Sequence, residues 1–142
     1  MSSVRWVILA LAVIPFGAGC GRGPLLAPVS GTVTLNGKPL PNVQVEFWPE
    51  TSAPRSTGMT DEQGRFTLVT DIGSPGAVVG PHKVILHDLA IYGEMGFRPR
   101  EDTNIKDKPA RFPFRYTDAR QTPVRLTVEA GGSRFDIPVE AR

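Results

Sequence analysis

Two histidines are the side chains best suited to acid–base or metal chemistry near neutral pH. His82 and His87 are five residues apart in a segment of alternating character. Because successive side chains of a strand point to opposite faces, we expect the two imidazoles on opposite sides of a sheet. Neither a His-Glu-x-x-His zinc motif nor a Gly-x-Ser-x-Gly nucleophile motif occurs. The sequence therefore predicts no catalytic residue, no metal ion and no cofactor, and the protein is not expected to be an enzyme.

Acidic residues in the second half of the chain supply oxygen ligands of the kind that calcium prefers. They are Glu94, Glu101, Asp102 and Asp107. Their spacing lacks the regular alternation of an EF-hand loop, so we expect a solvated loop surface rather than a calcium site.

A basic and aromatic segment is the best candidate for contact with a partner. Residues 98–120 carry seven basic and four acidic side chains, and arginine and aromatic residues are favoured in binding surfaces. The candidate partner-binding residues are Trp48, Arg98, Arg100, Lys106 and Lys108. The alternative is a solvated loop in which Phe112, Phe114 and Tyr116 pack against the edge of the core.

The first twenty residues differ from the rest of the chain. Arg5 precedes an apolar run over residues 6–16, and small residues follow as far as Cys20. As a helix, the run would reach only about 16 Å at ~1.5 Å per residue, against ~30 Å for a bilayer core. This order predicts a cleaved signal peptide rather than a membrane span.

The sequence Gly17-Ala18-Gly19-Cys20 resembles the lipobox of bacterial lipoproteins, although a Leu or Val is usual where Gly17 stands. The resemblance implies that residues 1–19 are a lipoprotein signal peptide and that Cys20 is lipidated, with palmitate among its acyl chains. Residues 20–28 would then be the lipidated cysteine and a tether. The protein would sit in the cell envelope, in the outer membrane rather than the inner one because Gly21 follows the cysteine. The alternative is a buried free cysteine.

The composition narrows the possible partners. The chain has 142 residues and a formal net charge of +2, with 16 basic and 14 acidic residues spread along its length, so no nucleic-acid partner is expected. The single cysteine cannot form an internal disulfide. With 15 glycines and 14 prolines, tight turns are expected and little room is left for long helices.

The rest of the chain shows the period-two alternation of strands with one buried face. Asn36-Gly37 predicts a tight turn, and two hairpins are expected, around residues 61–64 and around Gly131-Gly132. The fold class is therefore all-β, a single antiparallel β-sandwich of about seven strands over residues 29–142, with an irregular excursion at residues 89–122. The expected core residues are Phe47, Phe66, Leu68, Val84, Leu86, Leu126, Val128, Phe135 and Ile137.

Three stretches carry a family resemblance. They are VSGTVTLNGKPLPNVQVEF at residues 29–47, TDEQGRFTL at residues 60–68 and GPHKV at residues 80–84. They look like the carboxypeptidase regulatory-like domain, a transthyretin-like β-sandwich found in small lipoproteins of planctomycete-type bacteria. The resemblance implies a non-catalytic accessory module.

Two functions of different class are expected. The first is a structural or protein-interaction module, anchored to the membrane through the lipid on Cys20 and contacting an envelope protein or polysaccharide. The alternative is a carbohydrate-binding β-sandwich at the cell surface. Trp48 is expected to be exposed at a strand end, where its ring would stack on a sugar.

Overall fold

The computed structural model describes residues 23–92 and 109–141, and most of its regular structure is β. The strands are β1 (Leu26–Ala27), β2 (Val29–Leu35), β3 (Lys38–Pro39), β4 (Val43–Pro49), β5 (Ser56–Met59), β6 (Arg65–Thr67), β7 (Val69–Thr70), β8 (Ala77–Val78), β9 (Gly80–Asp88), β10 (Arg125–Val128) and β11 (Ser133–Val139). The helices in these ranges are α1 (Leu89–Tyr92) and the 3₁₀ helix η2 (Phe114–Thr117). The expected all-β fold is confirmed.

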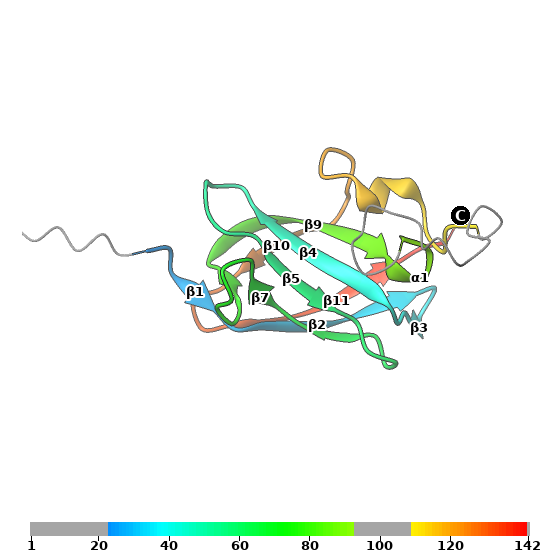
Figure 1. Ribbon diagram of the computed structural model, residues 1–142, viewed down its shortest axis with the longest axis horizontal. Helices are drawn as coiled ribbons and strands as arrows, with labels where there is room; N and C mark the ends of the chain where they lie inside the picture. The colour runs from blue at the N-terminus through cyan, green and yellow to red at the C-terminus, as the bar shows by residue number, and fades with distance from the viewer. Residues whose placement is uncertain (1–22, 93–108, 142) are drawn as a thin grey trace, which may run out of the picture.

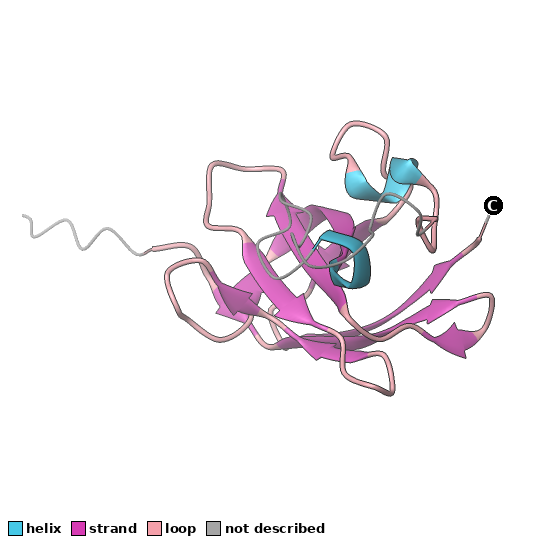
Figure 2. Cartoon of the chain, turned by 45° about the vertical axis from the view of Figure 1, so that its right-hand side comes forward, coloured by secondary structure: helices cyan, strands magenta, loops and turns pink. Residues whose placement is uncertain are grey.

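Two sheets face each other across one core (Figures 1 and 2). One sheet has the order β10-β9-β4-β5-β7, and the other has β11-β2-β3 with β6 also paired to β2. The short strands β1 and β8 pair beside them. The expected boundary at residue 29 is therefore wrong, because residues 26–27 of the expected tether form β1 and Ala27 is buried in the core. The expectation of about seven strands corresponds to the longer segments once β6 and β7, which follow each other along the chain, are counted together.

The Asn36-Gly37 turn joins β2 to β3 as expected. Leu35 pairs with Lys38, and Asn36 and Gly37 have φ angles of 48° and 80°. A two-residue turn with positive φ at both positions matches the right-handed twist of the flanking strands, which explains the Asn-Gly sequence.

The expected hairpin around residues 61–64 is confirmed at its turn and at its far end. Gly64 N–H donates to the Asp61 carbonyl, and Ser56 pairs with Thr70. Between these points the returning strand changes sheets, since β6 pairs with β2 while β7 pairs with β5. The change occurs at Leu68, whose buried side chain sits between the two sheets.

The expected hairpin around Gly131-Gly132 is wrong. β10 pairs with β9 in one sheet, whereas β11 pairs with β2 in the other, in parallel orientation. The sandwich is thus antiparallel except for the β2–β11 pair. Two strands that face each other across a core show the same alternation as two neighbours within a sheet, so the pattern did not distinguish the two arrangements.

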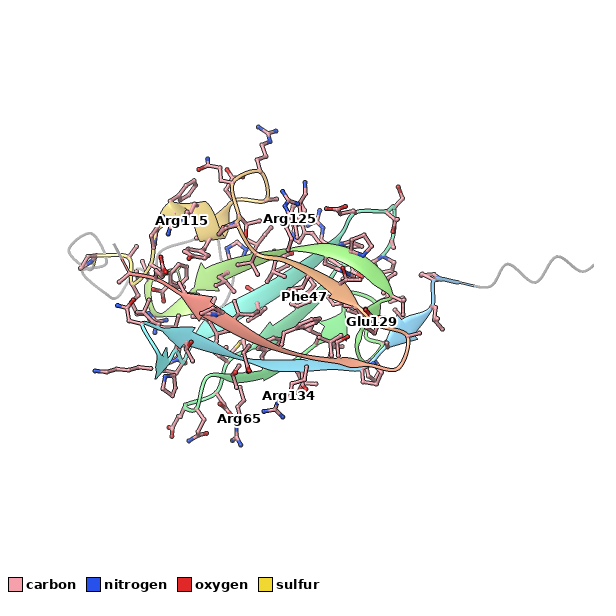
Figure 3. All side chains as sticks on the ribbon, turned by 180° about the vertical axis from the view of Figure 1, so that it is seen from behind. Phe47, Arg65, Arg115, Arg125, Glu129 and Arg134 are labelled. Atoms are coloured by element: carbon pink, nitrogen blue, oxygen red, sulfur yellow. The ribbon has the colours of Figure 1, made fainter. Side chains whose placement is uncertain are left out.

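Phe47 lies at the centre of the core (Figure 3), in contact with the rings of Phe66, His82 and Phe135. Of the expected core residues, all are buried except Leu126 and Phe135, which are partly buried and pack against the core. These two lie in β10 and β11, at the edge of each sheet, where one flank has no neighbouring strand.

Part of the expected excursion at residues 89–122 is packed structure. The rings of Phe112 and Tyr116 are buried and meet edge to face, whereas Phe114 is exposed. Thr122 donates its hydroxyl to the Val84 carbonyl at 2.6 Å. The segment therefore covers the half of β9 that β10 leaves free. The loop-packing alternative is confirmed for Phe112 and Tyr116, and it is wrong for Phe114, which is exposed.

Candidate functional site

Most of the predicted site residues lie outside the described ranges. This holds for Cys20, Arg98, Arg100, Lys106 and Lys108, and for the acidic residues Glu94, Glu101, Asp102 and Asp107. Of the predicted site residues, the structure describes Trp48.

Trp48 lies on the outer face of the five-stranded sheet, because Phe47 before it points into the core. The expectation that its ring is exposed is wrong. The side chain is half-buried, and the Arg55 guanidinium carbon stands 3.7 Å from the centre of the ring. A cation–π contact of this kind occupies one face of the indole, so that face is closed to a sugar.

Glu46 connects Trp48 to the neighbouring strand β9. His87 Nε2 lies 3.2 Å from one carboxylate oxygen of Glu46, and Arg55 lies 3.8 Å from the other. Burial by itself raises the pKa of Glu46, but the contacts with His87, Trp48 and Arg55 outweigh it, so the pKa lies below its ordinary value. The positive charge of Arg55 thus balances the negative charge of Glu46 beside Trp48.

Among the residues with a described position, no three His, Cys, Asp or Glu side chains gather as a metal site would require.

His82 lies in the core on the opposite face of β9 from His87, as the alternation predicted. Its Nδ1 is 2.9 Å from the Gly80 carbonyl, so Nδ1 carries the proton. Its Nε2 is buried without a hydrogen-bond partner within the described ranges. Burial lowers the pKa of His82, while the Gly80 carbonyl and the charge of Glu50 oppose that effect only in part.

The buried imidazole predicts a pH dependence of stability. Because the pKa of His82 is lower in the folded chain, the unfolded chain binds the proton first as the pH falls below about 6.5. The contribution of His82 to the free energy of unfolding should therefore be constant above that pH and decrease below it, until the folded pKa is reached. His82→Gln should flatten this decrease by at most about 1.4 kcal/mol per pH unit.

Urea unfolding at several pH values between 5 and 8 measures this dependence, with His87→Gln on the outer face as the control. An unchanged pH dependence in His82→Gln would show that the buried imidazole is not its cause.

Arg111 connects the segment that follows residue 108 to the end of β9. Its guanidinium binds both oxygens of Asp88, at 2.9 and 2.6 Å, and donates to the carbonyls of Pro41 and Asn42. Asp88 also accepts the N–H of Ala90 in the first turn of α1. The ends of the chain on either side of residues 93–108 are thus held together at one place.

A groove of about 480 Å³ lies on the outer face of the four-stranded sheet and was not foreseen from the sequence. Its lining includes Ser30 of β2, Thr67 of β6 and Arg134 of β11, which the strand pairing aligns in one row. Ser30 follows the apolar Val29 and Arg134 precedes the apolar Phe135, and this alternation was a signal that Ser30 and Arg134 face solvent. That they face solvent together depends on the unexpected pairing of β11 with β2.

No helix within residues 23–92 and 109–141 is long and apolar enough to span a bilayer.

Residues 29–92 match a family described as a domain of unknown function (DUF6795). The matched region runs from β2 through α1 and so includes the central strands of both sheets, Trp48 and the Glu46–His87 pair. No curated protein and no solved structure matches the chain.

Proposed function

We propose that this chain is a non-catalytic lipoprotein of the cell envelope, held in the membrane by lipid on Cys20, and that it binds a partner protein through the segment that includes Arg98, Arg100, Lys106 and Lys108. The β-sandwich is the fold expected of the carboxypeptidase regulatory-like domain that the sequence resembles. The placement in the outer membrane and the assignment to this domain type are parts of the same proposal.

One observation carries this proposal. The described chain begins at one end of the sandwich, next to β1, while α1 and the yellow segment that follows residue 108 lie at the opposite end (Figure 1). A membrane tether before Gly23 would therefore leave the other end of the domain directed away from the lipid surface. The contacts of Arg111 with Asp88, Pro41 and Asn42 fix the base of the basic segment at that end.

The test of the anchor uses metabolic labelling with a palmitate analogue in a bacterial host. The wild-type chain should be labelled and should fractionate with the outer membrane, and Cys20→Ser should lose the label. Labelling that survives this substitution would contradict the anchor, and fractionation with the inner membrane would contradict the placement.

The test of the partner site replaces residues 98–108 with a short Gly/Ser linker that ends before Pro109. The circular dichroism spectrum should stay that of a β protein, because loop length changes the closure entropy by only about 0.6 kcal/mol per doubling. A partner captured from detergent-solubilised envelope by the full wild-type chain should be lost by this variant.

A variant of full length with Arg98, Arg100, Lys106 and Lys108 changed to glutamine separates charge from the rest of the segment. Capture that is equal in all three chains, or loss of the β spectrum in the linker variant, would overturn the partner site.

Carbohydrate binding remains the second candidate, at a different place from the one expected. Arg55 covers one face of Trp48, so the aromatic on which that alternative rested is not free. The groove beside Arg134 favours it instead, because it offers side-chain donors on an open surface.

A further inference from the structure

The groove on the four-stranded sheet contains an arginine without a counterion. Arg134 is exposed and makes no ion pair with any residue whose position the structure gives. Figure 3 shows it beside Arg65 on the outer side of the sheet, pointing away from Phe47. All N–H groups of its guanidinium are therefore available to a ligand.

The second arginine of the groove is already neutralised. Arg65 Nε donates to Asp61 at 2.9 Å, and Asp61 also accepts the backbone N–H groups of Arg65 and Gln63. These contacts, the backbone hydrogen bond from Arg65 first, hold the pKa of Asp61 below its ordinary value. Asp61 and Arg65 thus form a neutral pair, and the free charge of the groove is the one on Arg134.

Asp136 faces the same side two residues further along β11. Its carboxylate accepts the hydroxyl of Thr32 at 2.5 Å, and it does not line the groove. Among the residues with described positions, it forms no ion pair with Arg134.

Two hydroxyl side chains lie in the same row as Arg134 on the outer face of the sheet. Ser30 and Thr67 flank each other across β2 and β6, with Arg134 on the other side of Ser30. Neighbouring strands are about 4.8 Å apart, so the row spans roughly two strand spacings. Neither hydroxyl is hydrogen bonded within the part of the chain that the structure describes, and both can donate and accept.

The strand arrangement decides what kind of ligand suits this surface. β2 is paired on both sides, to β11 and to β3 and β6, so its backbone groups are occupied and a peptide cannot add to it as a further strand. β11 is an edge strand, but a ligand that lies on the outer face above this row meets side chains, here one cation and hydroxyls. A sugar that carries a carboxylate matches this set, since its carboxylate pairs with Arg134 and its hydroxyls exchange hydrogen bonds with Ser30 and Thr67.

We propose that this groove binds an anionic saccharide of the uronic-acid type. Its volume of about 480 Å³ falls in the range of roughly 300–1,000 Å³ that small-ligand sites occupy. The inference deepens the carbohydrate-binding candidate above and is independent of the partner site at residues 98–108.

The experiment titrates the full chain in detergent with trigalacturonate by calorimetry at low salt. Binding should be saturable at one site and should weaken as salt is added. The methyl-esterified trisaccharide, which keeps the hydroxyls and lacks the charges, should bind at least tenfold more weakly. An equal affinity for both sugars would overturn the role of the carboxylate.

Arg134→Gln should weaken binding roughly tenfold, as expected for loss of a charge-assisted hydrogen bond. Thr67→Val, which keeps the shape of the side chain in a strand, should weaken it by a smaller factor. Arg125→Gln is the matched control, because Arg125 is an exposed arginine of the other sheet that already pairs with Glu50 at 3.3 Å. An equal loss in Arg134→Gln and Arg125→Gln would mean general attraction to a basic protein and would overturn the site.

Two further arms distinguish the remaining explanations. Inorganic phosphate at matched ionic strength should not displace the bound trigalacturonate, whereas monomeric galacturonate should. Displacement by phosphate but not by monomeric galacturonate would assign the groove to phosphate and overturn the saccharide site. The linker variant of residues 98–108 should keep its affinity. Loss of binding in that variant, with Arg134→Gln unaffected, would move the saccharide to the basic segment and overturn this inference without touching the partner-binding proposal.

Discussion

Replacing Arg111 with alanine is expected to lower the free energy of unfolding by about 3–5 kcal/mol. Asp88 is 2% exposed and Arg111 is 26% exposed, and the two are joined by paired hydrogen bonds. Removing the guanidinium leaves a buried carboxylate without its counterion and also frees the carbonyls of Pro41 and Asn42. Chemical denaturation followed by circular dichroism measures the change.

Arg111→Lys tests whether the geometry of the contact matters as well as its charge. Lysine keeps the positive charge but cannot bind both carboxylate oxygens in a planar fork, so its loss of stability should be smaller than that of alanine but still measurable. Arg125→Ala is the control, since its pair with Glu50 is exposed on both sides and should contribute about 0–1 kcal/mol. Losses of the same size in Arg111→Ala and Arg125→Ala would contradict a special structural role for the Arg111–Asp88 pair.

Phe112→Ala is expected to lower the free energy of unfolding by about 3–5 kcal/mol. The ring is 2% exposed and packs edge to face against Tyr116, with centres 6.2 Å apart. Its removal leaves a cavity where residues 109–122 cover the edge of β9, and the surrounding backbone can relax only in part. Thermal or urea unfolding provides the measurement.

Phe114→Ala is the matched control, only two residues away. Its ring is 59% exposed, and a surface change of this kind usually alters stability by no more than about 0.5 kcal/mol. Small and equal effects of the two substitutions would mean that this segment is not part of the folded core. A large loss of stability in Phe112→Ala but not in Phe114→Ala would show that residues 109–122 include part of the folded core. The partner site is proposed separately, at residues 98–108.

The interaction clusters were harder to foresee than the strands. Arg111 and Asp88 are 23 residues apart, and nothing in their local sequence marks them as partners. Trp48 was expected at an exposed strand end, but Arg55 from the loop before β5 folds over it. Long charged side chains reach across strands to neighbours that depend on how the strands are ordered.

Local sequence determined which segments are the longer strands, which of their faces are buried and where the tightest turn lies. Alternation identified Val84 and Leu86 as core residues, and Asn36-Gly37 identified the turn because few other residues adopt positive φ readily. Only the tertiary structure decided that β11 pairs with β2 rather than β10, and hence that Arg134 lies beside Ser30 and Thr67. The physical reason is that a period of two specifies the face that a strand buries, while the choice of neighbour depends on how whole sheets pack against each other.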